Sequence, residues 1–313
     1  MIVWGIFIFA ILIFLALDLG VFNRTAHVIS TKEASIWTAV WVSLALSFSA
    51  VIYWLYGTEF IENPKGLTQA EATIKYITGY LIELSLSIDN IFVIAVIFSS
   101  FNVPMKFQHR VLFWGILGAI IFRALMILFG VALINRFSWT TYLFGGFLIY
   151  TAIKMLVSKD EDFDPHNSFL FKQVRKIVPV TKTIEGEHFF VRKKHILAAT
   201  PLFIVLLIIE GTDILFALDS IPAILAITSD PFLVFSSNIL AILGLRSMYF
   251  FLSNMLEKFH YLKYSLVAIL SFVGVKMIIA EQIHFPEWVS LAVIAVSLGA
   301  GIVASLNSSS YRG

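Results

Sequence analysis

The sequence predicts an all-α integral membrane protein, and three observations lead to this fold class. Of its 313 residues, 59% are hydrophobic and 13% are charged, whereas soluble domains are about half apolar and about a quarter charged. The apolar residues form unbroken runs of about twenty, the length that crosses a bilayer core as a helix. They do not alternate with polar residues as the strands of a membrane β-barrel do.

Nine apolar segments are predicted to span the membrane. The first lacks the basic start and small-residue exit of a secretory signal, so we interpret it as a true span. The sixth would extend about 46 Å as a straight helix, which predicts a broken or strongly tilted helix. The segments are Ile2–Leu17, Ile36–Tyr56, Tyr76–Phe98, Val111–Leu133, Thr140–Val157, Ile196–Ala226, Phe232–Met255, Leu262–Ala280 and Trp288–Leu306.

The loop charges predict an orientation. Fifteen lysines and arginines fall in one set of loops, and three, Lys65, Lys75 and Arg136, fall in the other. Because cytoplasmic loops carry the excess of basic residues, the N-terminus is predicted outside and the C-terminus in the cytoplasm. The charged loop 158–195 is then cytoplasmic, and it is interpreted as a solvated linker, with a regulatory or docking role as the alternative.

An internal repeat relates the third and sixth spans. Glu83–Ile91 and Asp213–Ile221 share an acid, five residues, a second acid, a small polar residue and isoleucine. Further matches around Arg123 and Arg246, and around Lys154 and Lys276, follow in the same order. Since each unit has three spans, the second copy is predicted to be inverted, as in many secondary transporters. The predicted organisation is 1–57, two N-terminal spans; 76–157, first unit; 158–195, loop; 196–281, second unit; and 286–313, last span and tail.

Six acids lie inside these spans or at their edges. A central carboxylate costs about 2.5–3.5 kcal/mol on the insertion scale, so these groups are expected to face the bundle interior, a cation or water. Internal salt bridges with four intramembrane bases would account for at most four of them, and the surplus favours a cation site or a proton relay. The acids are Asp18, Glu83, Asp89, Glu210, Asp213 and Asp219, and the bases are Arg123, Lys154, Arg246 and Lys276.

Helical geometry limits how the sixth span can use its three acids. Glu210 and Asp213 share a face, whereas Asp219 is nearly opposite Glu210. Pro222 lacks an N–H group, so it offers a helix break at 219–222 that would free the carbonyl of Leu218, with a plain packing kink as the alternative. Asn90 and Ser220 are candidate neutral oxygen ligands, although a membrane serine commonly bonds back to its own helix.

The donor types restrict the chemistry. The chain has no cysteine, and all seven histidines fall in loops or at span ends, so the buried donors are carboxylate, carbonyl, amide and hydroxyl oxygens. Oxygen ligands suit Mg²⁺, Ca²⁺ and Mn²⁺ better than copper or zinc. The formal charge of +2 gives no reason to expect a nucleic acid partner, and no organic cofactor or protein partner is predicted.

Two motifs resemble the TerC family of bacterial membrane proteins. They are Leu81–Val93 and Ile209–Ala223; Glu187–Arg192 and Asn238–Tyr249 resemble its Alx branch in particular. The resemblance implies a LysE-superfamily transporter of the bacterial inner membrane that exports Mn²⁺, in a family named for tellurium resistance. It carries the motif acids over to Glu83, Asp89, Glu210, Asp213 and Asp219. The Gly211-Thr212 pair departs from the pattern, which puts the local packing in doubt.

The predicted function is therefore a secondary Mn²⁺ exporter rather than an enzyme, with proton exchange as a proposed coupling. Its expected partners are a divalent ion, protons and the lipid bilayer. Three alternatives stay open: transport of another dication such as Ca²⁺, a non-transporting partner that presents metal to other proteins, and an intramembrane hydrolase that uses paired carboxylates.

Overall fold

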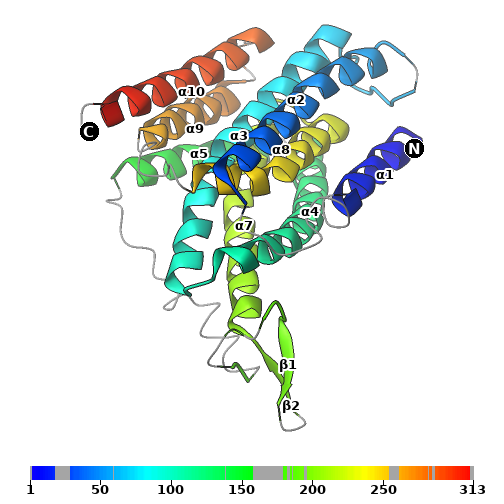
Figure 1. Cartoon of the computed structure of the whole chain (residues 1–313). Helices are drawn as coiled ribbons and strands as arrows, with labels where there is room; N and C mark the ends of the chain where they lie inside the picture. Colours follow the sequence, from blue (N-terminus) through cyan, green and yellow to red (C-terminus); the bar gives the residue numbers. More distant parts are fainter. Residues whose placement is uncertain are drawn as a thin grey trace.

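The computed structural model describes residues 2–17, 29–58, 60–137, 139–157, 179–181, 184, 186–193, 196–253, 261–280, 282–283 and 286–310. These residues form nine helices and one β-hairpin (Figure 1). The helices are α1 (Ile2–Leu17), α2 (Thr31–Leu55), α3 (Gln69–Ser100), α4 (Met105–Arg136), α5 (Trp139–Val157), α7 (Pro201–Leu225), α8 (Pro231–Leu252), α9 (Leu262–Ile279) and α10 (Glu287–Ser310). The hairpin is β1 (Phe190–Lys193) and β2 (Ile196–Ala199).

The all-α membrane fold is confirmed. Eight of the described helices are long and apolar enough to cross a membrane, and α1 is shorter, with 16 residues. Polar residues mark where several helices begin. Thr68 and Glu71 form a capping box at the start of α3, and the Asp230 carboxylate accepts from two backbone N–H groups at the start of α8. These caps satisfy the N–H groups that a helix leaves unpaired at its first turn.

The prediction of one overlong sixth span is wrong. Ile196–Ala199 form strand β2, which pairs antiparallel with β1, and α7 begins only at Pro201. Proline is favoured at the first helical position, where its missing N–H is not needed. The hairpin projects from the helices beyond the first turn of α7 (Figure 1), where the rings of Phe190 and Phe203 lie 4.4 Å apart. Part of the predicted 158–195 loop, Phe190–Lys193, is thus a strand.

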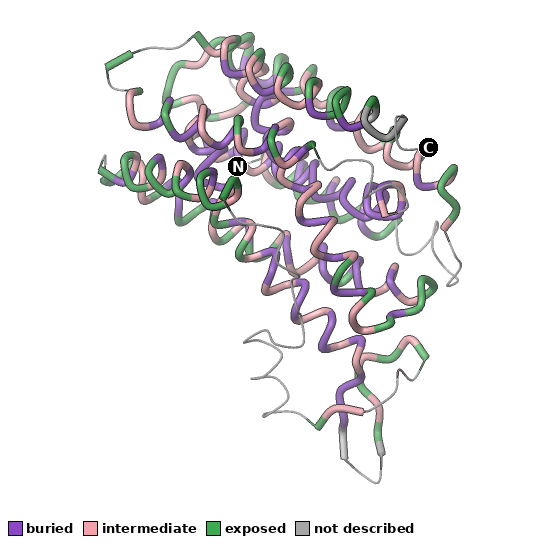
Figure 2. Tube along the Cα trace, turned by 90° about the vertical axis from the view of Figure 1, so that its left-hand side faces the viewer, coloured by how far each residue is buried: buried purple, intermediate pink, exposed green. Residues whose placement is uncertain are grey.

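The most deeply buried helix is α8, on which α2, α3 and α4 all pack. Figure 2 shows the buried residues along the central helices and the exposed residues along the outer ones. Many of the exposed residues are large and apolar, such as Leu125, Leu128 and Phe129 on α4, as expected for side chains that face lipid. The core that positions the site is therefore formed by α3, α4, α7 and α8.

The two predicted three-helix units pack on one another in a reciprocal way. Helix α3 packs on α8, α7 packs on α4, and α5 packs on α9. The α5–α9 pair is antiparallel, because Gly145 lies against Ile278 whereas Gly274 lies against Leu148. This pairing is compatible with an inverted repeat, which stays a prediction.

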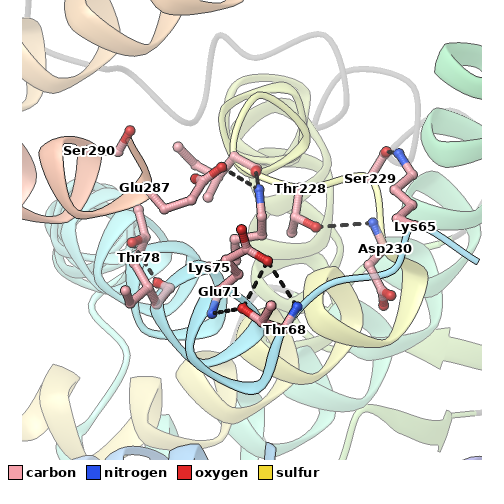
Figure 3. Close-up of polar contacts among 12 residues, drawn as sticks. Lys65, Thr68, Glu71, Lys75, Thr78, Thr228, Ser229, Asp230, Glu287 and Ser290 are labelled. Carbon is pink, nitrogen blue, oxygen red and sulfur yellow. Dashed lines mark hydrogen bonds and ion pairs between the residues drawn. The ribbon is translucent and has the colours of Figure 1, made fainter. Parts of the chain in front are cut away.

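Three segments that the charge count predicts on the outer side of the membrane contact one another (Figure 3). Lys75 of α3 donates to the carbonyl of Ile227, which follows α7, and pairs with Glu287 of α10 at 2.7 Å. On the opposite side of the bundle, Arg110 of α4 pairs with Glu187 beside the hairpin at 3.3 Å. The relative sidedness of these loops therefore agrees with the charge count, and the absolute orientation stays a prediction.

Glu287 is the counter-charge of two lysines, Lys75 and Lys276. We call Lys75, Lys276, Glu287 and Ser290 the outer cluster, and loss of the Glu287 charge is expected to destabilise it. The second carboxylate oxygen of Glu287 lies 3.8 Å from Lys276, which is buried and donates to Ser290 at 2.9 Å. Glu287→Gln should lower the apparent free energy of unfolding by about 1–3 kcal/mol, because two partly buried ammonium groups lose their counter-charge. Thermal unfolding in detergent measures this loss. Glu62→Gln removes the same charge from an exposed position, and an equal loss in both variants would contradict the prediction.

Candidate functional site

The candidate site lies where α3, α4, α7 and α8 meet, and it is centred on Arg123 of α4. The Arg123 guanidinium forms an ion pair with Glu83 of α3 through Nη1. Its Nη2 and Nε donate to the two carboxylate oxygens of Asp213 of α7, at 2.8 and 3.2 Å. Such a two-point contact matches the planar fork of arginine to a carboxylate. One guanidinium therefore holds two acids from two different helices.

Two amides complete the network around the acids. Asn90 of α3 donates to Asp213 Oδ1 at 3.0 Å, and Asn238 of α8 donates to Glu83 Oε2 at 2.8 Å. Both asparagines, both acids and Arg123 are buried. Buried charges of this kind persist only when they are paired and hydrogen-bonded. We call these five residues the Arg123 network.

The network reflects the sequence repeat. Glu83 and Asp213 are repeat equivalents, as are Asn90 and Ser220. Asn90 contacts Asp213, and Ser220 Oγ lies 3.5 Å from the Arg123 Nη1 that holds Glu83. The earlier residue of α3, Glu83, therefore lies near the later residue of α7, Ser220, whereas the later residue Asn90 lies near the earlier residue Asp213. The two helices thus cross antiparallel. The crossing brings the first acid of each motif to the same arginine.

The remaining motif acids go to other neighbours. The Glu210 carboxylate occupies the space beside Gly118 of α4, and its Oε2 is buried with no hydrogen-bond partner in the described structure. Asp219 accepts from Thr151 of α5 at 3.0 Å. Asp89 is half-buried on α3. Glu210 and Asp219 therefore face different helices, as the helical geometry predicts for a continuous α7.

The predicted helix break at Pro222 is wrong. Helix α7 continues through Pro222 to Leu225, and the N–H of Ala226 bonds to the carbonyl of Pro222. The proline lies in the last turns of α7, where its ring costs one backbone hydrogen bond, that of the Leu218 carbonyl. Tight packing holds this end of the helix in place, because Gly130 of α4 approaches Leu225 and Ile221 closely.

The four intramembrane bases have different environments. Arg123 pairs with two acids rather than the one expected. Arg246 lies 2.8 Å from His109 Nε2 on α4, and Lys276 belongs to the outer cluster described above. Lys154 is exposed in the last turn of α5. The sixth predicted acid, Asp18, lies outside the residues that the structure describes.

Two partners of the acids were missed by reasoning from the sequence. Asn238 and Thr151 each contact a motif acid, although neither lies in an acidic motif. Asn238 could have been found from the sequence, because an amide side chain inside an apolar span is costly unless it has a hydrogen-bond partner. Thr151 carried no such signal, because a helical threonine can bond to its own backbone.

The acids do not form one ligand shell in this arrangement. Among the described residues, no group of three or more histidine, aspartate or glutamate side chains is placed to hold a metal ion. The seven predicted ligands, Glu83, Asp89, Asn90, Glu210, Asp213, Asp219 and Ser220, stay a prediction. Binding of a dication by more than two of these carboxylates would require side chains or helices to move.

Comparison with known proteins identifies the family. The model of the integral membrane protein TerC family matches residues 68–312. The chain belongs to the TerC family. A membrane protein of Myxococcus xanthus, named as uncharacterized, is 52% identical over 308 residues, covering 98% of this chain and 93% of that protein. No solved structure matches the chain.

Several relatives in the TerC family carry the name Alx. The proteins from Salmonella typhi and Escherichia coli K12, both described as candidate membrane-bound redox modulators, are each 45% identical over 293 residues. These matches cover 93% of this chain and 89% and 90% of the two relatives. The resemblance to the Alx branch is therefore confirmed.

Proposed function

We propose that this TerC-family protein exports Mn²⁺ across the bacterial inner membrane as a secondary transporter. The observation that carries the proposal is the buried acid pair of the Arg123 network. Glu83 and Asp213 come from repeat-related helices and meet in the middle of the helical core, where ionised groups are costly. Intramembrane carboxylates that face the interior of a bundle are typical of ion pathways.

The donor set supports a hard dication. Besides the two carboxylates, buried oxygens on α3 lack hydrogen-bond partners in the described structure: Ser85 Oγ, Ser87 Oγ and Asn90 Oδ1. Glu83, Ser87 and Asn90 follow the i, i+4, i+7 spacing of one helix face. Oxygen ligands suit Mn²⁺, Ca²⁺ and Mg²⁺. The preference for Mn²⁺ over Ca²⁺ comes from the family resemblance, so transport of Ca²⁺ is the first alternative.

Proton exchange is the proposed coupling. Carboxylates that bind a metal must be deprotonated, so loading of a dication onto acids that carry protons would release those protons. Glu210 is the best candidate for such a proton carrier, because its buried Oε2 has no hydrogen-bond partner among the described residues.

The redox description of the relatives suggests a second class of function. Thiol–disulfide exchange by this chain would need cysteine, and the sequence contains none. A redox effect of this protein on thiols would therefore be indirect, for example through the supply of a metal ion to other proteins. Such a metal-presenting partner would need the acids but not transport.

Flux in proteoliposomes tests the proposal. We expect the purified protein to move Mn²⁺, and we expect Asp89→Asn and Asp219→Asn each to reduce the flux at least tenfold, because each removes a motif carboxylate. Glu62→Gln, at an exposed loop position, is the matched control and should transport normally. An imposed pH gradient that changes the rate would support proton exchange.

Three outcomes would contradict parts of this proposal. Flux of Ca²⁺ but not Mn²⁺ would leave a dication transporter with a different substrate. Normal flux in both acid variants would remove Asp89 and Asp219 from the pathway. No flux of any tested dication by folded protein would contradict transport and favour the metal-presenting partner.

A further inference from the structure

We propose that Arg123 is a built-in cation that occupies the acid pair when no metal is bound and gives up its place to the transported ion. This inference rests on the proposed dication transport and concerns its regulation. It assigns Arg123 a role in setting the affinity of the site, beyond that of an internal salt bridge.

The first argument is that the acids are already satisfied without a metal. Glu83 receives Arg123 Nη1 and the amide of Asn238, and Asp213 receives Nε, Nη2 and the amide of Asn90. Arg123 is 1% exposed and Glu83 is 1% exposed, so little water reaches the pair. A metal ion that binds these carboxylate oxygens must therefore compete with the donors that now hold them.

The second argument is electrostatic. Two carboxylates and one guanidinium leave the network one negative charge if both acids are ionised. Two unit charges 4 Å apart repel by about 4 kcal/mol at an effective dielectric constant of 20, and a dication doubles this repulsion. A dication and the guanidinium therefore compete for the acid pair. Movement of the arginine away from the pair lowers this repulsion and frees carboxylate oxygens for the ion.

The third argument is that the structure offers other hydrogen-bond acceptors for the displaced arginine and a further ligand oxygen for the incoming cation. Arg123 Nη1 already lies 3.5 Å from Ser220 Oγ and from Asn238 Oδ1, contacts that can shorten if the arginine leaves Glu83. Asn90 Oδ1 is buried beside Asp213 without a hydrogen-bond partner in the described structure. An amide oxygen in this position is a ready ligand for a cation bound by Asp213.

Arg123 holds one acid from each repeat unit, so its two ion pairs share one cation and are not independent of one another. The corresponding arginine of the second unit, Arg246, lies 2.8 Å from His109 Nε2. Arg123 thus links acids from α3 and α7, one from each unit. A metal ion that replaces Arg123 would contact both repeat units at once. Replacement of the arginine by the ion can therefore change how the two units are positioned relative to each other.

Mn²⁺ binding to the purified protein in detergent, measured by isothermal titration calorimetry at fixed pH, tests the inference. We expect Arg123→Gln to bind Mn²⁺ at least tenfold more tightly than the wild type, because the competing cation is gone. Glu83→Gln added to that variant should reverse the gain. Arg136→Gln, at an exposed position in the last turn of the same helix, is the control and should bind as the wild type does.

A structural role would give the opposite result. Equal or weaker Mn²⁺ binding by folded Arg123→Gln would overturn the inference. If that variant does not fold, Arg123→Met replaces it, since methionine also removes the competing charge and its flexible side chain fills much of the vacated space. Tighter Mn²⁺ binding is again expected, and unchanged binding would again overturn the inference.

The same titration separates this inference from the proposed function. Wild-type protein that transports Mn²⁺, combined with unchanged affinity in the Arg123 variants, contradicts only the inference. Wild-type protein that neither binds nor transports any dication contradicts both.

Discussion

Gly145→Leu is expected to prevent the packing of α5 on α9. A Cβ atom at Gly145 would lie 2.9 Å from the backbone carbonyl oxygen of Gly274 and 2.7 Å from the side chain of Ile278. The carbonyl belongs to a helix backbone and cannot turn aside, so the two helices must separate. We expect a loss of at least about 3 kcal/mol, the upper range for overpacked sites, or no folded protein.

The neighbouring glycine provides the control for this prediction. A Cβ atom at Gly146 would meet nothing within 4 Å, and this residue is exposed. Gly146→Leu should therefore keep the yield of monodisperse protein and the melting temperature of the wild type, measured by size-exclusion chromatography and thermal unfolding. Similar behaviour of the two variants would show that the α5–α9 contact does not hold the bundle together.

Gly118→Ala is expected to reduce Mn²⁺ transport at least tenfold while the protein stays folded. The added methyl group would occupy the position of the Glu210 carboxylate. Because this carboxylate is the far end of a flexible side chain, it can move away without displacing the α7 backbone. The predicted ligand and proton carrier would then lie elsewhere, and misplacement of a reacting group by about 1 Å is enough to cost a large factor in rate.

Gly115, one helical turn earlier on α4, offers a matched comparison. A Cβ atom there would lie 3.6 Å from Ile209, an ordinary van der Waals contact. Gly115→Ala should therefore transport Mn²⁺ at the wild-type rate. Proteoliposome flux and circular dichroism of both variants check the prediction. Equal flux would mean that the position of Glu210 beside α4 does not matter for transport.

Local patterns in the sequence were sufficient for most of the helices. A hydrophobic run predicted each helix of the described structure, although α2, α3 and α4 begin five to seven residues before the predicted spans. The predicted start of α7 is wrong in the other direction, because this helix begins five residues after the start of the predicted span. There the apolar residues of Ile196–Ala199 are as hydrophobic as a helix but pair with β1 instead. Hydropathy cannot separate these outcomes, because a short apolar run suits a strand as well as a buried helix.

The sequence by itself determined that this is a helical membrane protein of the TerC family, and it predicted that the motif acids avoid lipid, since exposure of a carboxylate to lipid is costly. This energetic cost implies that each acid needs a polar or charged partner, but it does not identify the partner. Only the tertiary structure decided that Arg123 holds both Glu83 and Asp213, that Asn238 joins them, and that Asp219 faces Thr151. These contacts join residues up to 155 positions apart, and they depend on how four helices pack.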